Sequence, residues 1–453
     1  MLVKKMHPYI YIIMTFVIVI LVGTLALMLP ISSSDGKSFG FVNSLFMATS
    51  AVCVTGLSVM NLAMDMSIFG RVVMTILMEI GGLSFITIAV FFFTIIGAKI
   101  GVSNRFLLRE ALNQNSVSGI VSLVKKIMLI SFSIQFICAL INLIPLMNYY
   151  NNNFWYSFGA SIFHSASSFN NAGFDIFGSE SLIPFKDNIL INSTTMVLIF
   201  LGGIGFIVID EIIKKRRWRK FNLHTKLTLI TTFILLIIGG LAIKLTYPEL
   251  SLLQSFFTSF ASRTCGSTTF DMAGLKNHPA CYIIIILLML IGASPCSTGG
   301  GIKTTTIAIA VLAIISYAKG KKTTVFHRKI QESQIFKSFV LIVMFSFIIF
   351  IGTFIICSIQ PELGIQEIFF EVVSAFSTTG FSMGITSSLN TTSRIIISIL
   401  MLLGRIGPLT IIGVVNKNWM TASNDDIQYV EESVIKFLKL TISSYYNYNI
   451  TSF

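Results

Sequence analysis

Long apolar runs separated by short polar segments dominate the 453-residue chain. Four of these runs lie near 9–29, 121–147, 225–246 and 335–359. A helix of about 20 apolar residues is long enough to cross a hydrocarbon layer of about 30 Å. Each run is therefore predicted to be a membrane-crossing helix.

A second apolar run follows each of these helices, near 70–97, 189–212, 280–318 and 393–416. The two sets together predict eight membrane spans. The two runs of each pair are separated by a shorter apolar and aromatic stretch.

These four shorter stretches lie near 41–57, 155–174, 251–267 and 366–381. Each has about a dozen residues before a polar end, which corresponds to about 18 Å of helix. That length cannot cross the membrane, so each stretch is predicted to enter the membrane and return to the same side.

Each short stretch ends in a polar motif that contains a glycine. The motifs are S-A-V-C-V-T-G-L, S-S-F-N-N-A-G-F, F-A-S-R-T-C-G-S and S-A-F-S-T-T-G-F. We call their glycines the loop glycines: Gly56, Gly173, Gly266 and Gly380.

A second glycine recurs in the apolar run behind each loop, in the motifs I-L-M-E-I-G-G, V-L-I-F-L-G-G, L-L-M-L-I-G-A and I-L-M-L-L-G-R. It follows the loop glycine by 25, 29, 26 and 24 residues in the four cases. Four matches in register indicate one unit used four times. We call these the helix glycines: Gly81, Gly202, Gly292 and Gly404. Apolar surroundings favour close helix packing over ion binding for Gly81, Gly82, Gly202, Gly203 and Gly205.

The predicted fold is an all-α integral membrane protein. Four helix–pore loop–helix repeats are expected in a pseudo-fourfold arrangement around one pore. The expected repeats cover 1–104, 105–220, 221–325 and 326–420, and 421–453 forms a cytoplasmic tail.

Composition supports the membrane class, because 54% of the residues are hydrophobic and only 11% are charged. The net charge of +13 could suggest nucleic-acid binding, but the basic residues collect in short segments between apolar runs. Such segments are typical of cytoplasmic loops, so both termini are expected in the cytoplasm and no nucleic acid is expected as a partner. The six cysteines show no metal-ligand spacing and are expected as free thiols.

Four re-entrant loops in one chain imply a shared aqueous axis, because non-helical backbone at membrane depth must lie inside protein or beside water. Backbone carbonyls can replace the hydration shell of K⁺, and glycine adopts the backbone angles that aim them at one axis. The short helices would point their negative ends toward the same cation. The candidate filter, with K⁺ at the four loop glycines, comprises Val54, Thr55, Gly56, Asn171, Ala172, Gly173, Thr264, Cys265, Gly266, Thr378, Thr379 and Gly380.

The second helix of the third repeat contains G-A-S-P-C-S-T-G-G-G-I-K-T-T-T, and a proline with three consecutive glycines makes a continuous helix improbable. We call residues 292–303 the intramembrane loop. It is interpreted as a gate below the filter, with a plain kink in a tilted helix as the alternative. The candidate gate residues are Gly292, Ser294, Pro295, Ser297, Thr298, Gly299, Gly300, Gly301 and Lys303.

Arg405 lies within the apolar run from Ile395 to Val415, about 11 residues or about 16 Å from its inner end. A charge at such depth normally faces the interior of a helix bundle and marks an ion path. Arg405 is interpreted as a barrier to cations beneath the filter and an anchor for the intramembrane loop. A purely structural contact with a carbonyl group is the alternative, and the two roles are compatible.

The motifs N-N-A-G-F, S-R-T, S-T-T-G-F and G-R-I-G-P-L-T, which begin at Asn170, Ser262, Ser377 and Gly404, carry a family resemblance. Through them the chain resembles the membrane subunit of Ktr-type potassium uptake systems, in the Trk/Ktr/HKT superfamily. The resemblance implies a multi-pass protein of the bacterial cytoplasmic membrane that carries K⁺. The resemblance further implies that a glycine at the first filter position, here Gly56, indicates K⁺ as the main transported ion.

The resemblance also implies a homodimer on a cytosolic ring of nucleotide-binding regulatory subunits. The basic segments Lys214–Lys220 and Lys319–Lys329 are candidate docking surfaces, and topology signals or contacts with anionic lipid explain them equally well. The family's dimer-forming tail motif is represented by Y-V-E-E at Tyr429–Glu432, without its proline.

No organic cofactor is expected, whereas Na⁺ is a candidate coupling ion. Coupling to Na⁺, coupling to protons and flux driven by the membrane potential stay open. An intramembrane enzyme is a weaker alternative, because the helix interiors carry few ionisable pairs. A non-transporting scaffold would leave the four loops unexplained.

Overall fold

The computed structural model describes residues 8–84, 87–88, 90–91, 94, 120–178, 181–326 and 328–407. The expected tail, its Tyr429–Glu432 motif, both chain termini and Pro408–Thr410 lie outside these residues. Compactness divides the chain into Met1–Val414 and Val415–Phe453, and the description below concerns the first unit.

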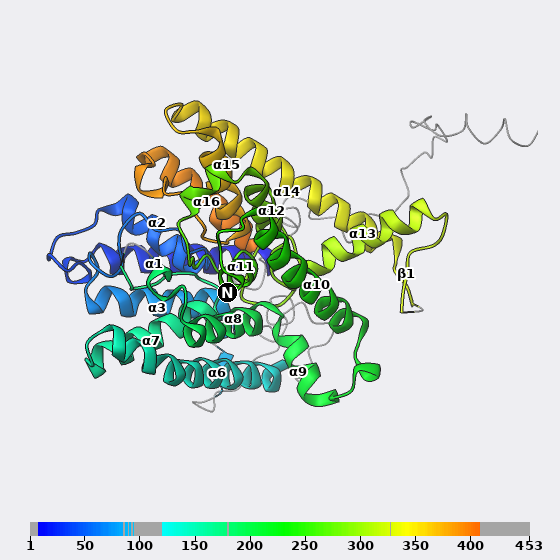
Figure 1. Cartoon of the computed structure of the whole chain (residues 1–453), viewed down its shortest axis with the longest axis horizontal. Coiled ribbons are helices and arrows are strands. Elements are labelled where there is room, and N and C mark those ends of the chain that lie inside the picture. Colours follow the sequence, from blue (N-terminus) through cyan, green and yellow to red (C-terminus); the bar gives the residue numbers. More distant parts are fainter. Residues whose placement is uncertain are drawn as a thin grey trace, which may run out of the picture. The chain divides into compact units, whose positions relative to one another are not determined.

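The described residues form helices almost throughout (Figure 1). Four of the helices are long and apolar enough to cross a membrane, and a bent pair counts as a fifth if it forms one span. The four long helices match the first helix of each expected repeat: α1 (Pro8–Met28), α6 (Ile120–Tyr149), α10 (Leu223–Thr246) and α14 (Glu332–Ile359).

A short helix follows each long one: α2 (Phe41–Val52), α7 (Phe154–Phe169), α11 (Leu252–Ala261) and α15 (Ile365–Ser377). Polar residues start two of them, since Asn153 caps α7 and a capping box of Ser251 and Gln254 opens α11. The short helices are largely buried, and their phenylalanines are among the largest fully buried side chains, such as Phe46, Phe257 and Phe370.

The long helices instead expose apolar side chains on one side, among them Leu25 and Phe350. The polar groups of Ser44, Ser161 and Ser255 on the short helices are buried. A protein with apolar side chains outside and polar side chains inside is suited to a lipid environment.

The second apolar runs contain these helices: α3 (Ile68–Leu83), α8 (Ile189–Gly203) with α9 (Phe206–Lys215), α12 (Pro279–Leu290) with α13 (Thr304–Ala318), and α16 (Thr391–Ile406). The expected break of the third repeat is present between α12 and α13. The expectation of a continuous helix over 189–212 is wrong, because α8 and α9 meet at an angle of 94°.

The helix ends recur at one position, three residues after the helix glycine. Ser84, Gly205 and Gly407 stand there with φ angles of 71°, 94° and 84°, and Pro295 stands there in the third repeat. A left-handed backbone cannot continue an α-helix, so α3, α8 and α16 end just before this point. In the third repeat α12 already ends at Leu290, before the helix glycine. Long apolar runs conceal these stops, because apolar residues continue beyond them.

The helices pack by one rule within and between repeats (Figure 1). Each long first helix packs on its own short helix: α1 on α2, α6 on α7, α10 on α11 and α14 on α15. Each second helix contacts the short helix of the following repeat: α3 on α7, α8 on α11, α12 on α15 and α16 on α2. The last of these contacts joins the fourth repeat to the first.

The remaining elements are short connections. A hairpin of β1 (Thr324–Val325) and β2 (Arg328–Lys329) joins α13 to α14, with Thr324 opposite Lys329. The 3₁₀ turns are η2 (Pro30–Ser32), η3 (Ile183–Phe185), η4 (Trp218–Lys220), η5 (Met272–Asn277) and η6 (Thr386–Ser388).

Candidate functional site

The four loops after the short helices share one backbone conformation. Each loop glycine has a positive φ, with values of 95° at Gly56, 71° at Gly173, 75° at Gly266 and 95° at Gly380. The residue two positions earlier also has a positive φ in every loop: Val54, Asn171, Thr264 and Thr378. Such angles are rare for residues other than glycine, so their fourfold recurrence marks a shared and constrained geometry.

Backbone hydrogen bonds tie each loop to the end of its own short helix. The amides of Thr55, Ala172 and Thr379 donate to carbonyls five residues earlier, each over 2.8 Å. In the third loop the amide of Gly266 donates to the carbonyl of Ala261 over 3.2 Å.

Two serine hydroxyls add a second tie in the first and fourth loops. The amide of Gly56 donates to Ser50 Oγ over 3.2 Å, and the amide of Gly380 donates to Ser374 Oγ over 3.0 Å. Ser167 occupies the same position in the second loop, and its Oγ is buried without a hydrogen-bond partner among the described residues. These serines were not among the predicted site residues, although the repeated S-A and S-S motifs contain them.

The four loop glycines meet in a closed ring. A Cβ atom added to any of them would collide with the carbonyl oxygen that precedes the next loop glycine. The distance from the added Cβ atom to the carbonyl oxygen would be 2.3 Å for Gly56 and Ala172, 1.7 Å for Gly173 and Cys265, 2.4 Å for Gly266 and Thr379, and 2.1 Å for Gly380 and Thr55. Only glycine fits both this spacing and the positive φ.

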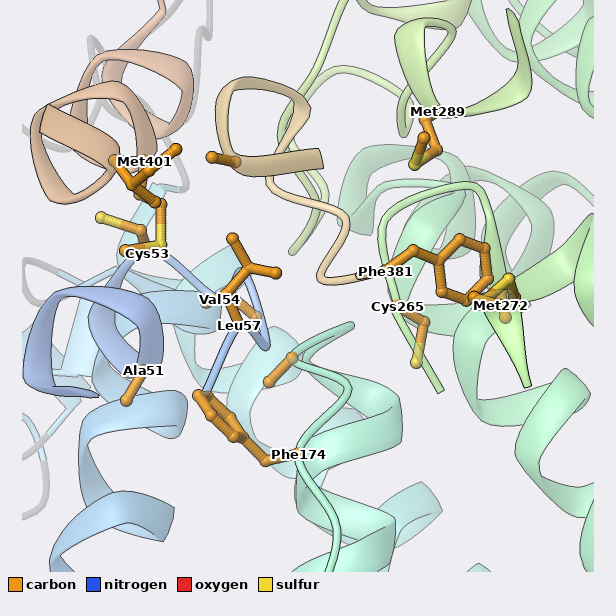
Figure 2. Packing of buried hydrophobic residues seen from close by; sticks show 14 of the residues in the cluster. Ala51, Cys53, Val54, Leu57, Phe174, Cys265, Met272, Met289, Phe381 and Met401 are labelled. Carbon is orange, nitrogen blue, oxygen red and sulfur yellow. The ribbon is translucent and has the colours of Figure 1, made fainter. Parts of the chain in front are cut away.

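Figure 2 shows the loops from close by, with Val54, Phe174, Cys265 and Phe381 coming from four different segments around a common centre. All four side chains are buried. They belong to one apolar cluster that surrounds the ring and fixes the loops in place. The structure therefore brings all twelve residues of the candidate filter to one place.

The helix glycines serve close packing behind this ring. A Cβ atom on Gly81, Gly202 or Gly404 would lie about 2 Å from a carbonyl oxygen at the end of the short helix of the same repeat, with values of 2.1, 1.9 and 1.9 Å. The fourth, Gly292, instead lies against the carbonyl of Gly300, at 2.3 Å. In the third repeat, the helix glycine therefore contacts the intramembrane loop, whereas in the other repeats it contacts the end of the short helix.

The intramembrane loop is anchored to the bend between α8 and α9. The amides of Ser294 and Thr298 donate to the carbonyls of Gly203 and Gly202, over 3.0 and 3.2 Å. In return, the amide of Phe206 donates to the carbonyl of Cys296 over 2.9 Å. These bonds satisfy backbone groups that the broken helices leave unpaired.

The glycine run of the loop lies directly against the third and fourth re-entrant loops. A Cβ atom on Gly299 would lie 2.0 Å from Thr264 Oγ1, and one on Gly300 would lie 2.2 Å from Thr378 Oγ1. The amide of Gly300 donates to the hydroxyl of Thr378 over 3.0 Å. The intramembrane loop therefore lies next to the ring, on the side formed by the residues that precede the loop glycines.

Pro295 and Ser297 lie at the turn of the intramembrane loop. The carbonyl of Pro295 would be 2.5 Å from a Cβ atom on Gly205. Ser297 Oγ donates to the carbonyl of Ser294 over 2.6 Å, and Thr304 Oγ1 bonds Ser294 Oγ over 3.1 Å. The loop is thus a folded unit with its own hydrogen bonds, which differs from a plain kink.

Three cationic side chains hold carbonyl groups around this loop. Lys303 Nζ donates to the carbonyl of Gly299 over 2.8 Å, and Arg263 Nη2 donates to that of Gly292 over 3.2 Å. Arg405 donates to the carbonyls of Thr298 and Gly81. Charge-assisted bonds of this kind are stronger than neutral ones.

The helix α16 ends at Ile406, so Arg405 lies in its last turn. Residues 408–416 of the expected span lie outside the described residues, so the expected distance of Arg405 from the inner end of that span stays a prediction. A basic group there also complements the negative end of the helix. Arg405 reaches carbonyls of the first and third repeats, so the expected anchoring contact with the intramembrane loop exists.

Two hollows lie on the opposite side of the ring. One of about 460 Å³ is lined by Gly56, Gly173, Asp65 and Asp175, and a second of about 580 Å³ is lined by Asp271 and Ser382. Carboxylates at such a mouth attract cations. In the described part of the chain, no group of three His, Cys, Asp or Glu residues could hold a metal ion.

Comparisons with known proteins support a transport site. A family model described as TrkH, cation transport protein, matches residues 2–247 and 223–418. Ktr system potassium uptake protein B of Bacillus subtilis is 38% identical over 410 residues, which cover 88% of this chain and 90% of that protein. The potassium/sodium uptake protein NtpJ of Enterococcus hirae is 36% identical over 452 residues, which cover 95% and 98%.

A solved structure has the same fold. The crystal structure of the potassium transporter TrkH from Vibrio parahaemolyticus superposes with a TM-score of 0.72 at 17% sequence identity. The match covers 92% of this chain and 86% of that one.

Proposed function

Because the chain belongs to the TrkH family of cation transport proteins, and is not an enzyme, we propose that it takes up K⁺ across a bacterial cytoplasmic membrane. The ion would bind at the ring of Gly56, Gly173, Gly266 and Gly380. The observation that carries this proposal is the closed ring of backbone contacts between the four loops.

The chemistry of the ring suits a dehydrated monovalent cation. Carbonyl oxygens of Thr55, Ala172, Cys265 and Thr379 each lie next to a neighbouring loop glycine, so a layer of oxygens surrounds one axis. Such a layer can replace the water shell of K⁺. The carbonyl ends of the short helices add a favourable negative potential.

The proposed architecture is a pseudo-fourfold set of four helix–pore loop–helix repeats with eight spans and the boundaries given above. It rests on the common packing rule of the helices and on the repeated φ pattern. Four of the spans would be second helices that stop or bend three residues after the helix glycine. Both termini would lie in the cytoplasm, as the basic inner segments indicate.

The proposed gate is the intramembrane loop, residues 292–303. Its glycine run touches Thr264 and Thr378, and its other side is held by Gly202 and Gly203. Opening would need the exchange of several hydrogen bonds, which suits a two-position element.

Arg405 is proposed as both anchor and barrier. Its guanidinium binds the carbonyl of Thr298 and so fixes the loop next to the ring. A positive charge close to the ion path also raises the local energy of a passing cation. Removal of this charge would release the intramembrane loop and would also lower the barrier, so both changes would raise the flux of cations.

Na⁺ is the proposed coupling ion, since NtpJ is named as a potassium/sodium uptake protein. Control by a cytosolic ring of nucleotide-binding subunits and assembly as a homodimer are proposed from the resemblance to Ktr systems.

Growth of a potassium-uptake-deficient bacterium tests the transport function. Expression of this chain with its regulatory subunit should restore growth at low K⁺ and should permit uptake of Rb⁺. Failure of growth and of Rb⁺ uptake, with the protein present in the membrane, would contradict the proposal.

The same assay with and without added Na⁺ distinguishes the driving forces. Faster Rb⁺ uptake with Na⁺ present, at a fixed membrane potential, is expected for Na⁺ coupling. Equal uptake with and without Na⁺ would indicate flux driven by the potential, which supplies about 2.3 kcal/mol per charge for each 100 mV.

A further inference from the structure

A groove outside the ion path combines a basic rim with an apolar wall. It has a volume of about 490 Å³ and lies between the end of α13, the β1–β2 hairpin and the beginning of α14. Figure 1 shows this hairpin extending from the junction of α13 and α14. We propose that the groove binds one anionic phospholipid, with its phosphate at the basic rim and an acyl chain along the apolar wall.

The basic rim is formed by three lysines. Lys321 and Lys322 lie in the connection between α13 and β1, and Lys329 ends the hairpin. Lys329 pairs with Glu332 over 3.2 Å, so the rim also contains one carboxylate. In the part of the chain that the structure describes, Lys321 and Lys322 have no carboxylate partner, which leaves two positive charges for a ligand.

The apolar wall consists of side chains from both helices. Ile314 and Tyr317 of α13 are 58% and 85% exposed, and Phe339 of α14 is 38% exposed. Exposure of such large apolar groups is costly in water but favourable against hydrocarbon. The helix α14 is long and apolar enough to cross a membrane, so this wall continues into a face that lipid would cover.

The order of these groups along the helices matches the order of groups in a phospholipid. The charges follow the last turn of α13, which ends at Ala318, while Ile314 lies one turn earlier. The apolar part therefore lies on the last turn of α13, and the charged part lies in the connection that follows it. Lysines at a helix end beside headgroups are typical of the membrane interface, and they bind anionic lipids there.

The shared chemistry of phosphate binding would also admit a free phosphate or a phosphorylated metabolite. The apolar wall favours a lipid, because a soluble phosphate would leave Ile314, Tyr317 and Phe339 uncovered. A soluble protein partner that used the lysines would likewise not require an acyl chain.

The test uses the purified full-length protein in a neutral detergent, depleted of native lipid. Phosphatidylglycerol is titrated in, and binding is counted by native mass spectrometry and followed by the shift of the Tm. The double variant K321Q/K322Q is expected to weaken phosphatidylglycerol binding about tenfold or more and to lose most of the Tm rise. Phosphatidylcholine should give a much smaller effect with the unchanged protein.

The matched control is K37Q/K186Q, which removes two exposed charges from connections outside both basic segments. It should bind phosphatidylglycerol as the unchanged protein does. Equal losses in both double variants would overturn the site, because they would indicate attraction by overall charge.

Two further outcomes would also overturn it. Unchanged lipid binding by K321Q/K322Q would assign these lysines to another partner. Glycerol 3-phosphate that competes as well as phosphatidylglycerol would show that the acyl chain contributes nothing and that the ligand is a free phosphate. No competition by glycerol 3-phosphate supports the lipid.

Discussion

The guanidinium of Arg405, in the last turn of α16, donates a hydrogen bond to the carbonyl of Thr298 in the intramembrane loop. The same guanidinium also binds the carbonyl of Gly81 at the end of α3. One side chain of the fourth repeat thus connects the first repeat with the interrupted helix of the third. The loop cannot leave its place beside the ring until these bonds break.

Arg405→Gln is expected to raise K⁺ flux about tenfold or more. A hydrogen bond to a charged group contributes about 1.5–3 kcal/mol, so its loss favours the displaced loop. Rb⁺ uptake into proteoliposomes at a fixed potential measures the change.

Arg405→Lys is the matched control for charge. Lysine keeps the positive charge but lacks the planar fork that reaches two carbonyls. Flux between that of the unchanged protein and that of Arg405→Gln is expected. Reduced flux in Arg405→Gln, with normal assembly, would contradict the anchoring role.

Gly380→Ala is expected to lower the K⁺/Na⁺ selectivity about tenfold, which corresponds to about 1.4 kcal/mol. Its Cβ would lie 2.1 Å from the carbonyl oxygen of Thr55, so that oxygen must move. The ratio of Rb⁺ to Na⁺ uptake in proteoliposomes measures the effect.

Gly384→Ala separates crowding from backbone strain. Gly384 has a φ of 93°, close to the 95° of Gly380, but nothing lies within 4 Å of its Cβ position. The K⁺/Na⁺ selectivity of Gly384→Ala should therefore stay near that of the unchanged protein. If both variants lost selectivity to the same extent, strain would explain the result and contact within the ring would not.

Removal of Gly299–Gly301 is expected to raise flux and to weaken its control by the regulatory subunit. The three glycines include the backbone that contacts Thr264 and Thr378, so a shorter loop withdraws from the ring. Uptake of Rb⁺ is measured with and without the regulatory subunit, and size-exclusion chromatography checks assembly. Lost flux in a well-assembled variant would argue against a gate.

Ser374→Ala is expected to destabilise the fourth re-entrant loop by about 0.5–1.5 kcal/mol, because the amide of Gly380 loses its bond to Ser374 Oγ. Ser167→Ala removes the equivalent hydroxyl in the second loop, where Oγ has no hydrogen-bond partner among the described residues. Thermal unfolding in detergent should therefore show a lower Tm for the first variant only. Equal Tm values for the two variants would contradict the asymmetry.

Glycine recurs in polar motifs at a steady offset from a second glycine, and this recurrence is what predicts four repeats. The positions of the long and short helices follow from run length and from the placement of polar residues. The break at Pro295 was evident from the three glycines after it.

The stops of the other second helices were not predicted. Ser84, Gly205 and Gly407 stand inside or beside apolar runs, and run length alone does not report a left-handed residue. The recurrence of a small residue three positions after each helix glycine would have revealed them.

The ring is closed by Gly380 against Thr55, the last loop against the first. During synthesis the ring therefore cannot close until the ribosome has passed the fourth repeat, because the first loop lacks its neighbour Gly380 until then. A chain truncated before Gly380 would retain most of its helices and still lack a complete layer of oxygens. Loss of residues 380–453 is thus expected to abolish ion binding at the ring, including at the first loop, which is made early in synthesis.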